Sequence, residues 1–158
     1  MKRTWDFLGI VCYWLTWPGV ALFLRNSTRT RIIVNCGDEI LLVKTWLGSG
    51  KWGLPGGGLH RHEDPTQGAV RELQEETGIV AKTESLEYLS SHVQHKRGVQ
   101  YTLVVYALRL SKKPEIRRQR LEINDATWRS WRAIYQSEKT EPYIKAFLEQ
   151  CFMGEDGT

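Results

Sequence analysis

Cysteine is scarce in this chain of 158 residues. The three cysteines, Cys12, Cys36 and Cys151, are odd in number and far apart. No two of them have the short spacing of zinc ligands, and such a set does not make the disulfide framework of a small secreted domain. We therefore expect free thiols in a reducing, cytoplasmic compartment. The length favours one domain with a sizeable core.

A strong excess of one charge is also lacking. The chain has 22 Lys and Arg residues against 18 Asp and Glu residues, which gives a formal net charge of +4. This balance suits an anionic substrate, but ordinary protein surfaces reach it as well. Residues 109–120 are rich in Arg and Lys, and such runs are more often solvated loops than RNA sites. We expect no specific nucleic-acid binding.

Residues 1–28 differ from the rest of the chain, because residues 7–24 contain no charged side chain. A run of this length is near the lower limit for a membrane span, and basic residues follow it at positions 25, 29 and 31. Two interpretations stay open: membrane attachment with the rest of the chain on the cytosolic side, and a hydrophobic arm packed on the domain or across a homodimer. A cleaved signal peptide is disfavoured, because no small-residue cleavage site precedes Arg25.

A glycine-rich loop leads into a predicted helix with three glutamates. Asp64-Pro65 is typical of a helix start, and Gly78 is typical of a helix end. Between them, Glu72, Glu75 and Glu76 share one helix face roughly 100° wide. Like charges repel on such a face. The cluster is therefore either a solvated acidic surface or a site for a hard divalent cation.

These residues belong to a longer pattern, which reads Gly57, five residues, Glu63, seven residues, Arg71-Glu72-Leu73, one residue, Glu75-Glu76, one residue, Gly78-Ile79. It resembles, at every fixed position, the Nudix box of the Nudix hydrolase family, the MutT-type hydrolases of nucleoside diphosphate-linked compounds. A chance match is expected at roughly one start in 10⁹. The resemblance implies an α/β fold, the Nudix α/β/α sandwich with a mixed sheet. We expect it over residues 29–158, behind the hydrophobic extension of residues 1–28.

The resemblance also implies roles for single residues. A divalent metal, Mg²⁺ or Mn²⁺, would be held by Glu72, Glu75, Glu76 and the carbonyl oxygen of Gly56. The catalytic candidates in the box are Glu72, Glu76 and Arg71. Glu63 and Arg71 resemble the pair that braces the loop against the helix, and Gly57 and Gly78 are structural positions of the motif.

A further catalytic glutamate often lies outside the box, ahead of the last strand and a tryptophan. Glu122, six residues before Trp128, resembles it. Asp125 is the runner-up, and a simple surface carboxylate is an equally good interpretation of Glu122.

The function that the resemblance implies is metal-dependent hydrolysis of a phosphoanhydride bond in a nucleoside diphosphate-linked substrate. No proline lies between Thr66 and Lys113, so the proline that marks many ADP-ribose hydrolases is missing. Lys96 and Arg97 occupy the neighbourhood of the tyrosine typical of diadenosine polyphosphate hydrolases. Elimination favours a nucleoside triphosphate over a dinucleotide, a nucleotide sugar or an RNA 5′ end. A non-catalytic nucleotide-sensing module is disfavoured, because the box has kept all its glutamates.

The rest of the chain predicts a sheet and a second helix. Strands are expected at residues 30–35, 39–45, 86–94, 100–110 and 127–131, because these runs are rich in β-branched and aromatic residues. Residues 142–152 place their apolar side chains on one helical stripe, which predicts an amphipathic helix that covers the sheet.

Overall fold

The structure is a computed structural model that describes residues 27–46, 49–96, 99–117 and 123–149. The predictions for residues 7–24 and for Glu122 fall outside these ranges, as do Cys12 and Cys151. Within the described ranges, no helix is both long enough and apolar enough to cross a membrane.

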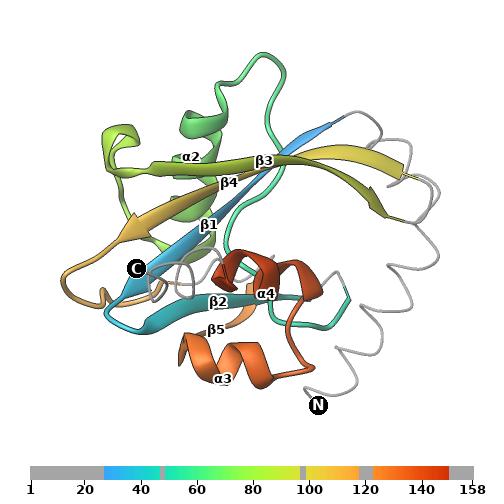
Figure 1. The fold of residues 1–158 in the computed structure, drawn as a ribbon. Coiled ribbons are helices and arrows are strands. Elements are labelled where there is room, and N and C mark those ends of the chain that lie inside the picture. The colour runs from blue at the N-terminus through green and yellow to red at the C-terminus, as the bar shows by residue number, and fades with distance from the viewer. Residues whose placement is uncertain (1–26, 47–48, 97–98, 118–122, 150–158) are drawn as a thin grey trace, which may run out of the picture.

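Five strands form one mixed sheet (Figure 1). Their order across the sheet is β3-β4-β1-β2-β5, with β1 and β4 parallel and the other neighbours antiparallel. The bounds are β1 Thr28–Cys36, β2 Glu39–Thr45, β3 Glu87–Lys96, β4 Val99–Arg109 and β5 Ile123–Ser130. The predicted mixed sheet is confirmed.

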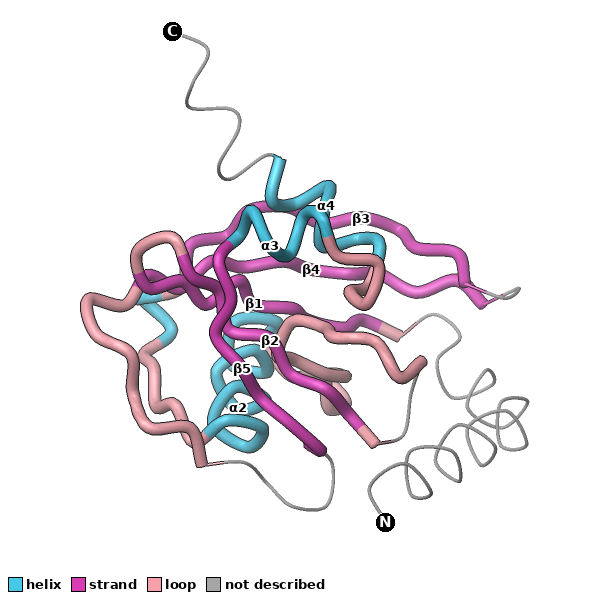
Figure 2. The backbone as a smooth tube through the Cα atoms, turned by 90° about the horizontal axis from the view of Figure 1, so that it is seen from below, coloured by secondary structure: helices cyan, strands magenta, loops and turns pink. Residues whose placement is uncertain are grey.

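Helices cover both faces of this sheet. Side chains alternate along β1, so Ile32 and Val34 pack against α2 (Pro65–Thr77), while Ile33 packs under α3 (Trp131–Gln136) and α4 (Pro142–Leu148). Figure 2 shows α2 on one side of the strands and the other two helices on the opposite side. The α/β/α sandwich is therefore as the sequence predicts.

The last strand and the helix after it differ from the prediction. β5 begins at Ile123 and ends at Ser130, and Trp131 begins α3, a helix that is absent from the sequence prediction. The Ser130 hydroxyl accepts a hydrogen bond from the Ala133 N–H at 3.3 Å and so caps this helix. A 3-10 turn at Thr83–Ser85 was not predicted either. The predicted start of α4 at Pro142 is confirmed.

The loop before α2 enters the sheet between β1 and β2. These strands pair with each other only near their shared turn, where Asn35 faces Ile40 and Cys36 faces Glu39. Beyond that point β1 pairs with the loop instead: the Ile32 N–H donates to the Pro55 carbonyl oxygen at 2.9 Å, and the Thr30 N–H donates to that of Gly57 at 2.8 Å. The insertion fixes the glycine-rich loop to the centre of the sheet.

Candidate active site

Local signals set both ends of α2. The Asp64 carboxylate accepts hydrogen bonds from the backbone N–H groups of Thr66 and Gln67, at 2.9 and 3.1 Å. Gly78 ends the helix with a φ of 75°, and its N–H donates to the carbonyl oxygen of Gln74. The predicted start and end of the helix are thus confirmed.

Arg71 links the loop to the helix. Its Nε donates to one carboxylate oxygen of Glu63 at 2.8 Å, and its Nη2 donates to the other at 3.0 Å. Nη2 also donates to the Gly58 carbonyl oxygen at 3.0 Å, while Nη1 donates to Glu72 and Glu75 at 2.9 and 3.0 Å. A guanidinium has five N–H donors, so these five bonds use all of them. The pair predicted to brace the loop is therefore in direct contact.

This network shifts the pKa values of both members of the pair. Hydrogen bonds from Arg71 and from the His60 backbone N–H lower the pKa of Glu63 to about 2. Hydrogen bonds to Glu63 and then to Glu72 raise the pKa of Arg71 above its usual range. Both groups stay charged throughout the neutral pH range, and the brace keeps its full strength there.

Two glutamates of α2 approach the loop backbone closely. Glu76 is 6% exposed, and its carboxylate accepts the backbone N–H of Gly56 at 2.8 Å. A Cβ on Gly57 would collide with the carboxylate of Glu72. Gly56 has a φ of 127°, which L residues rarely adopt. Glycine is therefore required at both positions for the carboxylates to reach the loop.

The donor chemistry of these groups fits a hard divalent cation, because carboxylate and carbonyl oxygens are its usual ligands. In the part of the chain that the structure describes, no three His, Cys, Asp or Glu side chains are gathered into a ready metal cluster. Glu72 and Glu75 are held by Arg71, and the Gly56 carbonyl oxygen accepts a hydrogen bond from Arg31. A metal at this site would therefore compete with Arg71 for the carboxylates of Glu72 and Glu75.

The other candidates lie apart from the box. Glu122 is outside the described residues, so its role stays a prediction. Asp125 is exposed on β5, opposite Lys44 of β2. Arg31 is a further partner of the loop, and no sequence motif predicts this role. The sequence indicates only that Arg29 and Arg31 lie on the same face of a strand as Ile33, which belongs to the core.

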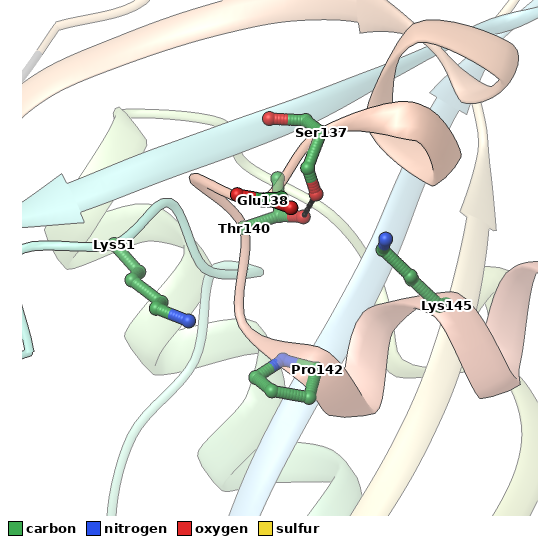
Figure 3. A pocket seen from close by; sticks show the side chains of 6 residues that line it. All are labelled: Lys51, Ser137, Glu138, Thr140, Pro142 and Lys145. Atoms are coloured by element: carbon green, nitrogen blue, oxygen red, sulfur yellow. Dashed lines mark hydrogen bonds between the residues drawn. The ribbon is translucent and has the colours of Figure 1, made fainter.

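A cavity of about 420 Å³ opens between the loop before the box and the connection from α3 to α4 (Figure 3). Its lining consists of Lys51, Ser137, Glu138, Thr140, Pro142 and Lys145. The Thr140 hydroxyl donates to the carbonyl oxygen of Ser137 at 3.1 Å. No residue predicted for the site lines this cavity, and we assign it no catalytic role.

An α/β/α sandwich that carries the pattern of residues 57–79 is typical of one class of hydrolases. Comparison with known proteins identifies the family. The NUDIX domain family model matches residues 24–151. The chain belongs to the NUDIX domain family. Members of this family are hydrolases that act on pyrophosphate bonds and generally use divalent metals.

Two relatives show the extent of the sequence similarity. Nudix hydrolase 2 of Arabidopsis thaliana is 32% identical over 136 residues, which are 80% of this chain and 47% of that protein. A diphosphoinositol polyphosphate phosphohydrolase of Homo sapiens is 29% identical over 121 residues, which are 74% of this chain and 64% of that protein. The chain thus spans less than two thirds of the length of both relatives.

Solved structures share the fold. The MutT NUDIX hydrolase from Burkholderia pseudomallei has a TM-score of 0.69 and 21% identity, over 80% of this chain and 98% of that one. An Ap4A hydrolase from C. elegans has a TM-score of 0.69 and 17% identity, over 84% of this chain and 99% of that one. At identities this low, the similarity shows a shared fold and nothing about the substrate.

Proposed function

We propose that this protein is a metal-dependent pyrophosphohydrolase that cleaves a phosphoanhydride bond in a nucleoside diphosphate-linked substrate. The observation that carries the proposal is the contact of two helix carboxylates, Glu72 and Glu76, with the backbone of one glycine loop. The carboxylate oxygens, which can bind a metal, thus lie next to glycine backbone groups that a phosphate can approach closely.

The metal in this proposal is Mg²⁺, with Mn²⁺ as a substitute. Its ligands would be Glu72, Glu75, Glu76 and the carbonyl oxygen of Gly56. When bound, the metal would neutralise the negative charge of the phosphate groups.

The residues of the chain supply positioning and proton transfer. Arg71 orients Glu72 and Glu75, and Glu63 holds Arg71 in place through two hydrogen bonds. A carboxylate accepts the proton of the water that attacks phosphorus, as general base. We assign this role to Glu122, and Asp125 or Glu72 takes it if Glu122 does not.

For the substrate we propose a nucleoside triphosphate or a related nucleotide. The named relatives differ among themselves: one is a diphosphoinositol polyphosphate phosphohydrolase, and a solved NUDIX domain of Shewanella oneidensis NrtR is a complex with ADP ribose. The competing hypotheses are a dinucleotide, a nucleotide sugar or an RNA 5′ end as substrate, and a module that senses nucleotides without cleaving them.

A hydrolysis screen tests this function. The full-length protein is incubated with nucleoside triphosphates, dinucleotides, nucleotide sugars and 5′-triphosphate RNA, with Mg²⁺ or with EDTA. We expect cleavage of at least one compound with Mg²⁺ and none with EDTA. Binding of a nucleotide without cleavage of any compound would favour the sensing module instead.

We also propose that residues 7–24 bring the protein to a membrane, with the domain on its cytosolic side. The support is the uncharged run of these residues, followed by Arg25, Arg29 and Arg31. The same side holds the nucleotide substrates.

A further inference from the structure

Two arginines stand beside the box loop on the face of the sheet that carries α4. Arg29 and Arg31 are two residues apart on β1, so both point to the same face as Ile33. Tyr101 of β4 and Tyr143 of α4 pack against the core on this face. The negative charge of Glu76 acts on both arginines across the loop.

The two guanidinium groups differ in their partners. Arg31 donates to the carbonyl oxygens of Thr30, at 2.9 Å, and of Gly56. Among the residues that the structure describes, none is hydrogen-bonded or ion-paired to the guanidinium of Arg29. Burial lowers the pKa of Arg29, and the neighbouring charge of Arg31 lowers it further. A partly buried charge without a direct partner is unfavourable, so packing does not explain this arginine.

There is open space next to Arg29. It forms an antiparallel bridge with Gly58, and side chains of such a directly opposed pair lie on the same face. A Cβ on Gly58 would meet no atom within 4 Å. A Cβ on Gly57 would collide with Glu72 instead. The loop thus leaves room over Gly58, opposite Arg29 and next to the glycine that contacts Glu72.

We propose that Arg29 binds a phosphate group of the substrate other than the diphosphate that is held at the box glutamates. The substrate is then a linear polyphosphate, as in a nucleoside triphosphate, and not a diphosphate joined to an uncharged sugar. This inference rests on the proposed function. A guanidinium binds two phosphate oxygens with its planar fork, and the phosphate supplies the negative charge that Arg29 lacks. Arg31 is already engaged by the carbonyl oxygens of Thr30 and Gly56, so Arg29 is the better candidate of the two.

Calorimetric titration of the full-length protein with tripolyphosphate in EDTA tests the inference without catalysis. We expect binding by the wild type and a loss of about tenfold to a hundredfold in affinity for Arg29→Gln, the range for a lost charge-assisted hydrogen bond. Arg29→Lys should fall between the two, because lysine keeps the charge but not the fork. No binding by the wild type, or equal affinity of wild type and Arg29→Gln, would overturn the proposal.

Arg109→Gln is the matched control. It removes the same charge from the same sheet, but at the other end of the parallel pair of β1 and β4. Arg109 of β4 is opposite Asn35 of β1, whereas Arg29 of β1 is opposite Leu103 of β4. Six residues of strand separate the two positions, which is about 20 Å. Arg109→Gln should bind tripolyphosphate as the wild type does. An equal loss in both variants would mean that only the net charge matters and would overturn the assignment.

Kinetics and thermal melting separate a binding role from a structural one. With Mg²⁺, Arg29→Gln should raise KM for a nucleoside triphosphate at least tenfold and leave KM for a nucleotide sugar unchanged. Its melting temperature without ligand should equal or exceed that of the wild type, because an unpartnered charge is removed. An equal rise of KM for both substrates, or a large fall in melting temperature, would overturn the proposal. If the wild type cleaves no compound, the proposed function fails, and the tripolyphosphate titration still decides the role of Arg29.

Discussion

Replacement of Glu63 by glutamine should weaken the brace between the loop and α2 without changing the size of the side chain. Arg71 approaches both carboxylate oxygens of Glu63, with Nε at 2.8 Å and Nη2 at 3.0 Å. An amide offers only one oxygen, so its NH₂ group would face a guanidinium N–H. The Glu63→Gln variant therefore loses one hydrogen bond and the charge of the pair.

The pKa of Glu63 sets the size of the effect. It falls from 4.5 to about 2 on folding, and each pKa unit corresponds to about 1.4 kcal/mol. The full shift gives about 3 kcal/mol, and screening by solvent at a partly exposed pair reduces this to about 2 kcal/mol. For a domain of this size, that loss lowers the melting temperature by about 4–8 °C.

The effect should depend on pH with a defined sign. Because folding lowers the pKa of Glu63, its stabilisation is complete above about pH 4.5 and is lost as the pH falls through about 2. Scanning calorimetry of wild type and Glu63→Gln at about pH 7, 5 and 3 should show a constant difference at the two higher values and a smaller one at the lowest. Glu138→Gln, an exposed glutamate, is the control and should melt with the wild type. A Glu63→Gln difference that is absent at pH 7, or unchanged at pH 3, would refute this reasoning.

Three further predictions concern the loop, the general base and the N-terminal segment. Gly57→Ala should destabilise the fold by about 1 kcal/mol in urea denaturation, because its Cβ displaces the Glu72 carboxylate from Arg71, while Gly58→Ala should not; equal stability of the two variants would contradict the close packing of loop and helix. Glu122→Gln should lower turnover about 10²-fold or more at saturating Mg²⁺, and unchanged turnover would pass the role to Asp125 or Glu72. Full-length protein should sediment with membranes at low and high salt, and a protein that begins at Thr28 should stay active in the supernatant; wholly soluble full-length protein would exclude membrane attachment.

The elements that the sequence predicts well are those with local signals. Asp64-Pro65 and Gly78 mark the ends of α2 through caps that lie within four residues of each end. The six residues of α3 carry no long apolar period, so the sequence predicts that the preceding strand continues to Trp131. Its strongest local signal, the Ser130 cap, is also compatible with a turn.

The candidate site divides in the same way. The contact of Arg71 with Glu75 spans four residues and follows from helix spacing, whereas its contact with the adjacent Glu72 does not. The contact of Glu76 with Gly56 spans 20 residues, and that of Arg31 with Gly56 spans 25. Both exist because the loop enters the sheet beside β1, which no local pattern encodes. The sequence therefore predicts a shared carboxylate face but not the burial of one of its members.

The most direct test of metal-dependent hydrolysis at the box is the turnover of Glu76→Gln compared with that of Gln74→Ala. Both are measured at saturating Mg²⁺ on the compound that the wild type cleaves best. The glutamine at position 76 keeps an oxygen for the Gly56 N–H, so the loop stays in place while the carboxylate charge is lost. Gln74 is exposed on the same helix. Loss of several kcal/mol of charge stabilisation predicts a fall of about 10³-fold for Glu76→Gln and none for Gln74→Ala. Equal turnover by all three proteins would contradict the account.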